Sequence, residues 1–165
     1  DLIFIHTTSR NISEAPLPLS ASEQEVRDAL ERQFSHFSQM WERLHEVYHC
    51  PIIQNNFELP STRLMGNRDA WDCHGMVWFI QELNRKFGQY AASHSDFYLH
   101  DLHYLAASYG LDAWHDDSYW YLYKYAMTLD AVPEFAYSLT RIIRSIYGKN
   151  KKVLALDLDL SLIHI

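Results

Sequence analysis

Short apolar runs alternate with long segments of helical periodicity along this chain, and this alternation limits its possible folds more than any other feature. The predicted strands cover residues 2–6, 50–54 and 97–99. The predicted helices cover residues 20–48, 76–90 and 133–148. Strands and helices that alternate at this spacing favour a parallel sheet with helices packed on its faces. We therefore predict an α/β fold with three layers, in the order α/β/α.

The predicted helix boundaries rest on residues typical of helix ends. Ser20, followed three residues later by Glu23, predicts a capping-box start for the first helix. Its apolar face recurs at helical spacing: Val26, Leu30, Phe34, Phe37, Trp41, Leu44 and Tyr48. Pro133 predicts the start of the last of the three helices and Gly148 its end. An aromatic cluster lies just before it, and we expect it to pack in the core and at its rim: Tyr119, Trp120, Tyr121, Tyr123 and Tyr125.

Length, charge and cysteine content exclude several classes of protein. The 165 residues, 48% of them hydrophobic, suffice for one domain with a substantial core. A net charge of -7, with no basic block beyond residues 149–152, disfavours nucleic acid as a partner. No apolar run approaches the roughly 20 residues that span a bilayer, so no membrane is expected. Cys50 and Cys73 lack metal-ligand spacing and are expected to be ordinary thiols of a cytoplasmic protein.

The last apolar run, residues 153–158, brings two carboxylates together at Asp157 and Asp159. Strand side chains alternate between faces, so both carboxylates would point the same way from the carboxyl end of a buried strand. Open α/β sheets place their chemistry at that edge. Such a pair can bind a hard cation, or divide the roles of nucleophile and general acid/base. The residues alone leave a second interpretation open, in which the strand simply ends in solvated acids.

Two histidine patterns compete with this pair. His45, Glu46 and His49 match H-E-x-x-H, which can bind zinc, but they lie in the last turn of a predicted helix. A third ligand would have to come from the loop at residues 69–74, and helix C-termini favour imidazoles without any metal. The sequence His-Asp-Leu-His at 100–103 follows a predicted strand, where it would form either a site or a hydrogen-bonded rim.

Two polar loops complete the set of candidates. Asp112 and His115 lie three residues apart in a predicted loop, where the carboxylate could orient and charge-stabilise the histidine as a base. Such a base needs a nucleophile, and no serine of this chain lies in a strand-to-turn nucleophile context. Residues 55–60 form the second polar loop, in which backbone and amide groups are free to face a ligand.

Four segments carry a resemblance to a known family: IFIHTTSRNI, CPIIQNNFELP, FYLHDLHYLAASYGLDAWHDDSYWY and YGKNKKVLALDLD. Together they resemble FkbH-like proteins of the haloacid dehalogenase (HAD) superfamily, and the likeness covers nearly the whole chain up to Asp159. The resemblance implies the C-terminal portion of an SGNH-hydrolase-like, flavodoxin-like domain over residues 1–148. It also implies the first strand of a truncated HAD domain over residues 149–159.

The same resemblance implies roles for individual residues. Asp157 would be the nucleophile of the first HAD motif and Asp159 the general acid/base, and both would bind Mg²⁺. Asp112 and His115 would correspond to the D-x-x-H pair of SGNH-like domains. These assignments come from the family likeness and not from the spacing of the residues.

The chain also departs from the family pattern. Arg10, followed by Asn11, stands about where SGNH-like domains carry an oxyanion asparagine. Residues 160–165 replace the Asn-Thr-Leu-Trp-Gly-Gly expected after D-x-D, and we expect them to be a non-native tail. Because the chain begins with Asp1 beside an apolar run, we expect a fragment that lacks upstream strands and any nucleophilic serine on them.

The resemblance implies an enzyme as the parent protein. FkbH-like proteins resemble enzymes that take a glyceryl unit from 1,3-bisphosphoglycerate, release phosphate, and load the unit on an acyl carrier protein in polyketide-type biosynthesis. We therefore expect a phosphorylated acyl substrate, an acyl carrier protein as partner and Mg²⁺ as cofactor, and we expect the fragment alone to be inactive. Two alternatives stay open: an SGNH-type ester hydrolase, and a non-catalytic docking module for a carrier protein.

Overall fold

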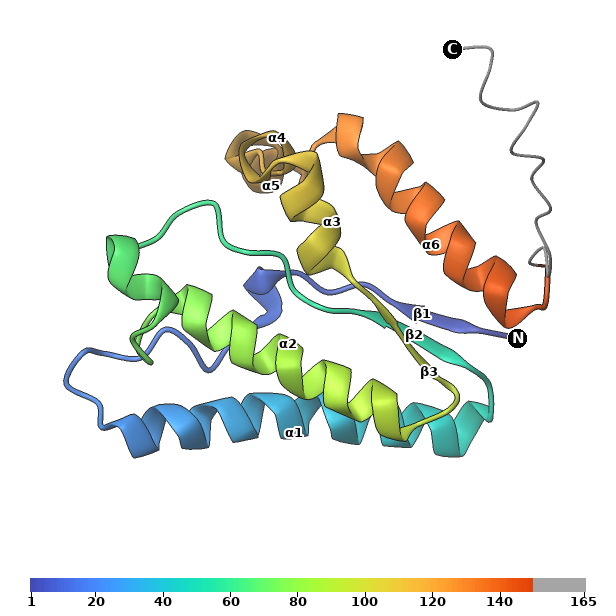
Figure 1. Cartoon of the computed structure of the whole chain (residues 1–165), viewed down its shortest axis with the longest axis horizontal. Helices are drawn as coiled ribbons and strands as arrows, with labels where there is room; N and C mark the ends of the chain where they lie inside the picture. Colours follow the sequence, from blue (N-terminus) through green and yellow to red (C-terminus); the bar gives the residue numbers. More distant parts are fainter. Residues whose placement is uncertain (150–165) are drawn as a thin grey trace, which may run out of the picture.

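A parallel sheet of three strands forms the centre of the molecule (Figure 1). The computed structural model describes residues 1–149. The strands lie side by side in chain order as β1 (Ile3–Ile5), β2 (Ile52–Asn55) and β3 (Phe97–His100). Ile52 of the central strand pairs with Ile3 on one side and with Phe97 on the other. The predicted parallel α/β architecture is confirmed.

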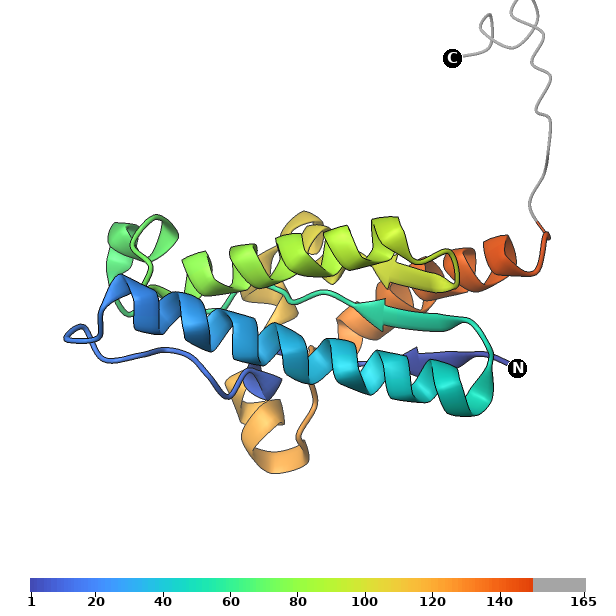
Figure 2. The same ribbon diagram turned by 90° about the horizontal axis from the view of Figure 1, so that it is seen from below.

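Two long helices cover one face of this sheet. α1 (Glu23–Tyr48) connects β1 to β2, and α2 (Met76–Ser93) connects β2 to β3. Because the strands follow one another in order and such crossovers are right-handed, both helices fall on the same face, where Figures 1 and 2 show them side by side. The main core lies between these helices and the sheet. Its centre is Trp41, whose ring meets that of Phe87 edge-on at a centroid distance of 4.7 Å.

The start of α1 differs from the prediction by two residues. The capping box is formed by Ser22 and Glu25, not by Ser20 and Glu23. The Ser22 hydroxyl accepts from the Glu25 amide, and the Glu25 carboxylate accepts from the Ser22 amide at 2.6 Å. Both pairs fit the S-x-x-E spacing, so the pattern alone could not separate them. The pair that is closer in sequence to the apolar residues of α1, Ser22 and Glu25, forms the cap.

α2 is capped by a buried carboxylate from a preceding short helix, η2 (Gly66–Ala70). Asp69 is 1% exposed, accepts from the Val77 amide at 2.7 Å and also accepts from the Met65 amide at 3.2 Å. Gly75 precedes α2 and lies so close to η2 that a Cβ would come within 2.3 Å of the Asp69 carbonyl oxygen. Asp69 therefore holds the entry into α2 and does not act as a metal ligand beside the helical histidines.

The other face of the sheet is covered by α6 (Val132–Ile146), which begins one residue before Pro133 (Figure 1). Phe135 supplies the contact, with its ring 6.1 Å from Phe4 and 5.1 Å from His100 by centroid. No side chain of α6 is fully buried: Phe135, Leu139, Ile142, Ile143 and Ile146 are half-buried, whereas Val132 and Tyr137 are exposed. The three-layer arrangement is thus present, with the second helical layer thinner than the first.

Three further helices follow β3 at the carboxyl ends of the strands: α3 (Leu102–Tyr109), α4 (Leu111–Trp114) and α5 (Asp117–Tyr123). A short helix, η3 (Leu129–Ala131), leads into α6. A second, smaller core joins α3 and α4 to the start of α6, with Trp114 fully buried at its centre. The predicted loop after Gly110 is therefore largely helical.

The aromatic cluster on and after α5 was expected in the core and at its rim, but it lies mainly on the surface, with only Tyr119 and Trp120 half-buried. Tyr121 is 71% exposed, Tyr123 58% and Tyr125 44%. Trp120 is half-buried and lies under the Arg10 guanidinium. Aromatic content alone does not distinguish core from surface.

The described residues also bear on what was expected of membrane spans and of the two cysteines. Within 1–149, no helix is long and apolar enough to cross a membrane. Cys50 and Cys73 are both free thiols, as expected, with Cys50 buried and Cys73 half-buried.

Candidate functional site

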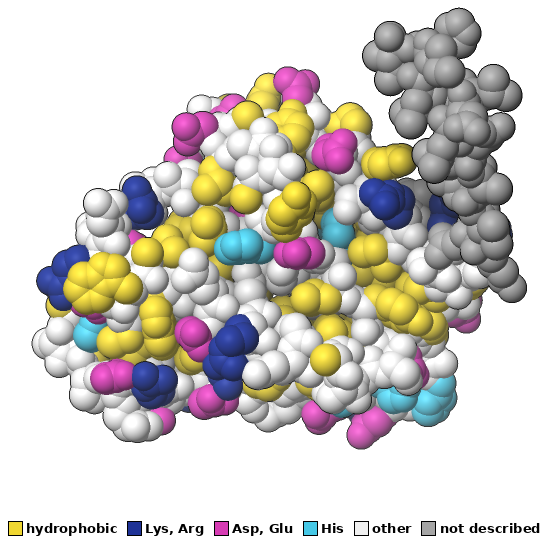
Figure 3. All heavy atoms as spheres, viewed as in Figure 1, with side chains coloured by type: hydrophobic (Ala, Val, Ile, Leu, Met, Phe, Trp, Pro, Cys, Tyr) yellow, Lys and Arg dark blue, Asp and Glu magenta, His cyan; other side chains and the backbone are white. Residues whose placement is uncertain are grey.

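Buried polar side chains gather where the three strands end. Gln54 and Asn55 close β2, Thr7 follows β1 and His100 closes β3, and none of the four is more than 8% exposed. The carboxyl edge of a parallel sheet is where open α/β folds place ligand sites. In Figure 3, histidine and acidic side chains meet near the middle of the molecule, where β3 leads into α3.

The amides of β2 hold the loop that follows β1. The Asn55 side chain accepts from the Thr7 amide at 2.9 Å and donates to the Thr7 carbonyl at 2.6 Å. The Gln54 amide nitrogen donates to the Thr7 hydroxyl at 2.9 Å, while its oxygen accepts from the indole of Trp41 at 3.1 Å. These amides therefore satisfy the backbone and are not free to face a ligand, contrary to the expectation for residues 55–60. Buried polar groups are generally paired in this way.

Glu58 is the exception in that loop. Its side chain is 2% exposed, and one oxygen, Oε1, accepts from the Ser9 amide at 3.2 Å and the Ser9 hydroxyl at 3.1 Å. The other oxygen, Oε2, is buried and has no hydrogen-bond partner. A buried carboxylate oxygen without a donor is costly, which makes Glu58 the group at this edge that most needs a partner.

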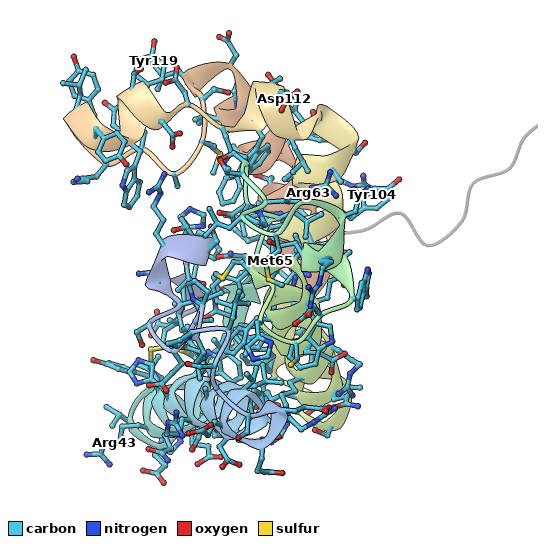
Figure 4. All side chains as sticks on the ribbon, turned by 90° about the vertical axis from the view of Figure 1, so that its left-hand side faces the viewer. Arg43, Arg63, Met65, Tyr104, Asp112 and Tyr119 are labelled. Carbon is cyan, nitrogen blue, oxygen red and sulfur yellow. The ribbon has the colours of Figure 1, made fainter. Side chains whose placement is uncertain are left out.

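An open cleft of about 310 Å³ lies above Glu58, between the loop after β1, the loop after β2 and α5. Arg10 spans it: the guanidinium donates to Asp117 at 2.8 Å and lies 4.6 Å above the ring of Trp120. Figure 4 looks at this side of the molecule, with α4 and α5 above and the loop carrying Met65 below. The cleft therefore has a carboxylate at its floor and a cation across its mouth.

The structure brings His115 to this cleft but leaves Asp112 away from it. His115 lines the cleft, and its Nε2 donates to the backbone carbonyl of Leu59 at 2.9 Å. Asp112 lies exposed on α4 and does not line the cleft (Figure 4). Within the described residues, no hydrogen bond joins the two side chains. Because Nε2 carries the proton that Leu59 accepts, Nδ1 is the acceptor nitrogen of a neutral His115 ring.

Arg10 and Asn11 belong to a short helix after β1, η1 (Ser9–Asn11). Asn11 closes a capping box, because its side-chain oxygen accepts from the Thr8 amide at 2.9 Å. The side-chain amide of Asn11 is thus engaged in a hydrogen bond to the backbone of this loop. The position at which an oxyanion asparagine is expected carries Arg10, which instead bridges to α5.

The His-Asp-Leu-His sequence at 100–103 forms a hydrogen-bonded rim. Asp101 caps α3 by accepting from the Tyr104 amide at 3.2 Å, and also accepts from the Asn56 side chain at 2.8 Å. His100 is 1% exposed, and its Nε2 lies 3.0 Å from the Ser138 hydroxyl. Burial, together with repulsion from His6, lowers the pKa of His100 to about 4. The ring is therefore neutral at physiological pH.

The H-E-x-x-H residues form no metal centre within the described part of the chain. His49 ends α1 in the left-handed conformation, and the centroids of the His45 and His49 rings are 6.3 Å apart. His45 faces Asp96 at 3.8 Å instead. The motif marks the end of a helix at the amino edge of the sheet, away from the cleft.

Asp72, Cys73 and His74 are close enough to hold a metal ion, but they are engaged in hydrogen bonds. His74 lies between the Ala21 carbonyl at 2.9 Å and the Asp72 carboxylate at 2.8 Å, and these bonds raise its pKa. The His74 amide and ring, with Arg68, lower the pKa of Asp72. A thiol and an imidazole are poor ligands for Mg²⁺, so this cluster does not fit that ion.

Asp157 and Asp159, the predicted nucleophile and acid/base, lie outside the described residues. The strand predicted at 149–159, apart from its first residue, and the tail at 160–165 also lie outside them, and the domain boundary at 148 stays a prediction. Their roles therefore stay predictions. Sequence reasoning missed Glu58, for which the only signal was a carboxylate in the polar loop at residues 55–60, after a buried strand.

Comparison with solved structures identifies a related fold. The chain resembles the N-terminal part of the protein BF1531 from Bacteroides fragilis, described as containing a phosphatase domain and complexed with Mg. The TM-score is 0.77 at 22% sequence identity, and the match covers 97% of this chain and 41% of that one. This chain thus spans less than half the length of that protein, and the likeness establishes the fold. A search of curated proteins found no match.

A family model covers most of the chain. The model described as "FkbH, N-terminal domain" matches residues 1–144, which include the whole sheet and the cleft. The predicted resemblance to FkbH-like proteins is therefore confirmed. By this match, the chain belongs to the family of FkbH N-terminal domains.

Proposed function

We propose that this chain is the N-terminal part of an FkbH-like enzyme whose chemistry takes place in a HAD-type phosphatase domain. The parent would take a glyceryl unit from a phosphorylated acyl substrate, release phosphate, and pass the unit to an acyl carrier protein in the cytoplasm. The observation that carries the proposal is the FkbH match over residues 1–144, just before the D-x-D sequence. The structural neighbour, with its phosphatase domain and Mg, supports it.

Asp157 and Asp159 would perform the phosphoryl chemistry. Asp157 would attack the phosphorus of a phosphate ester in the substrate, so that the P–O bond breaks and the alcohol leaves with a proton from Asp159. Water, activated by Asp159, would then release phosphate from the aspartyl phosphate. The acyl phosphate carbonyl would be left for the thiol of the carrier protein, with phosphate as the leaving group. Two carboxylates provide the oxygen ligands that Mg²⁺ prefers, so the donor set fits this ion. When bound, Mg²⁺ screens the negative charge of the phosphate.

Exchanging the nucleophile tests this proposal in the full-length protein. We expect Asp157→Asn to abolish Mg²⁺-dependent phosphate release from the phosphate ester of a phosphorylated acyl substrate, because an amide cannot attack phosphorus. We also expect a chelator such as EDTA to stop release by the unaltered enzyme. Asp28→Asn, on the exposed face of α1, is the matched control and keeps full activity. Persistent turnover by Asp157→Asn would disprove the assignment.

Ester hydrolysis in the cleft is the second candidate, favoured by the place of His115 at the carboxyl edge of the sheet. It requires a serine within reach of that ring. His115→Gln and Asp112→Asn in the full-length protein separate the candidates. Loss of ester cleavage with intact phosphate release would support hydrolysis, whereas unchanged turnover and unchanged binding of the carrier protein would leave both residues structural.

A further inference from the structure

In the cleft, no cation among the described residues forms a hydrogen bond or ion pair with the Glu58 carboxylate. Glu58 is 2% exposed and its Oε2 has no partner. His6 is close enough to feel this carboxylate, but desolvation lowers the His6 pKa by more than Asn55 and Glu58 raise it. The His6 ring is therefore mainly uncharged at neutral pH and does not balance Glu58. A carboxylate buried without a cation is expensive, so a positively charged group in the cleft would stabilise it.

The other charged groups of the cleft are already engaged. Asp116 caps α5 by accepting from the Ser118 and Tyr119 amides at 2.8 and 3.2 Å. Asp117 accepts from Arg10. Three carboxylates thus line the cleft against one guanidinium, and the carboxylate at the floor has the free oxygen. This balance favours a cation over an anion.

Arg10 can leave the mouth of the cleft at small cost. Its bond to Asp117 joins two surface side chains, 41% and 61% exposed, and such ion pairs contribute little to stability. The ring of Trp120, which Arg10 now covers, can accept another cation on its face. The volume of about 310 Å³ is at the lower end of the range for small-molecule sites.

We propose that this cleft binds a small ligand with a primary ammonium group, anchored by the Oε2 atom of Glu58. The ammonium donates to Oε2 and balances the buried charge, while the hydroxyl groups of Ser9 and Ser61 and the ring of Trp120 surround the rest of the ligand. The proposed site uses residues other than Asp157 and Asp159, and it goes beyond the phosphoryl chemistry proposed for the parent.

Ammonium fits better than the two nearest alternatives. A neutral hydroxyl would satisfy the hydrogen bond of Oε2 but would leave the carboxylate charge uncompensated. A metal ion needs several ligands, and within the described residues the metal-type cluster found is Asp72, Cys73 and His74, which does not include Glu58. An ammonium group supplies both the donor and the charge.

Titration of the full 165-residue chain with three small probes tests the site. Ethanolamine carries an ammonium group, ethylene glycol is its neutral analogue, and tetramethylammonium is a cation without an N–H donor. Amide shifts in two-dimensional NMR spectra are followed at constant ionic strength. We expect ethanolamine to give saturable shifts at Ser9, Glu58 and His115. Ethylene glycol should give none, and tetramethylammonium should bind more weakly than ethanolamine.

Two variants identify the anchor. Glu58→Gln keeps an oxygen for Ser9 but removes the charge, and should weaken ethanolamine binding about tenfold or more. Glu46→Gln removes one exposed carboxylate at the opposite edge of the sheet, and should leave binding unchanged. If Glu58→Gln does not fold, Arg10→Ala still decides, because loss of the competing guanidinium should tighten binding severalfold. Equal binding of ethylene glycol, or no tightening in Arg10→Ala, would overturn the proposal.

Discussion

At the scale of single residues, buried polar groups determine the loops at the carboxyl edge of the sheet. Trp41, Gln54 and Thr7 form a continuous chain of hydrogen bonds that reaches from α1 through β2 to the loop after β1. Asn55 binds the same loop twice through Thr7. Because each of these donors and acceptors has a partner, the loop is held firmly where it forms the wall of the cleft. Glu58 Oε2 and His100 Nδ1 are the described side-chain atoms that are buried without one.

His100 predicts a pH dependence of stability. The pKa of folded His100 is about 4, whereas the ordinary pKa of an exposed histidine is 6.5. Between these values the unfolded chain binds more protons, so the free energy of unfolding falls as the pH drops from 6.5 to about 4. The loss attributable to His100 is at most about 3 kcal/mol.

Urea unfolding followed by circular dichroism at pH 7 and pH 5 measures this effect. His100→Gln keeps a nitrogen near the Ser138 hydroxyl but cannot titrate, so its stability should fall less than that of the unaltered chain over this range. Equal pH slopes for the two proteins would contradict the assignment to His100.

At the scale of elements, the entry into α2 depends on close backbone contact. Gly75 lies against η2, and Asp69 of η2 caps the first turn of α2. Neither feature follows from the helical periodicity that predicted α2, because the cap is eight residues away from the amide that it binds. The ends of a helix thus depend on the path of the chain outside it.

Two glycine substitutions with opposite expected effects test this contact. A Cβ on Gly75 would lie 2.3 Å from the Asp69 carbonyl oxygen, so Gly75→Ala should lower the free energy of unfolding by about 1–3 kcal/mol. Gly88, inside α2, has no atom within 4 Å of its Cβ position, and Gly88→Ala should raise stability by about 1 kcal/mol. Urea denaturation measures both. Similar changes in the two variants would show that Gly75 matters only through helix propensity.

At the scale of the whole molecule, two cores divide the fold. The main core lies between the sheet and the pair α1 and α2, and the smaller one joins α3, α4 and the start of α6. The cleft lies between the loops held by the main core and α5. The bond between Arg10 and Asp117 bridges these parts across the cleft. Relative movement of the parts would therefore change both this bond and the width of the cleft.

The separation of the cores predicts additive stability effects. Ile80→Val in the main core should cost about 0.5–1.5 kcal/mol, and Leu102→Ala in the smaller core about 2–5 kcal/mol. Their double variant should equal the sum within about 0.5 kcal/mol. Phe37→Leu and Phe87→Leu are the comparison pair within one core, because the two native rings lie 5.2 Å apart by centroid. The stability changes of these two substitutions should not be additive. Strong coupling of Ile80 with Leu102 would mean one continuous core.

Much of the fold was predictable because its signals are local. The apolar runs predicted as strands correspond to β1, β2 and β3, and the predicted ends differ from the observed ones by at most two residues: 2–6, 50–54 and 97–99. The alternation of strands and helices correctly implied parallel pairing. The family, too, could be recognised from segments of the chain. The aromatic residues of α5 were misplaced because exposure depends on which helices lie beside them, and a short aromatic run contains no such information.

The candidate site was less predictable, since it depends on contacts between distant residues. The sequence by itself determined the fold class, the family, and a polar edge at the carboxyl ends of the strands. Only the tertiary structure decided that the amides of β2 bind the loop after β1, that His115 reaches the cleft without Asp112, and that Glu58 keeps one oxygen free. Ser9 and Glu58 are 49 residues apart in the chain. Long-range contacts of this kind decide whether a charge is buried and whether it is paired. Periodicity indicates only which residues near one another in the sequence lie on the same face of a helix or strand.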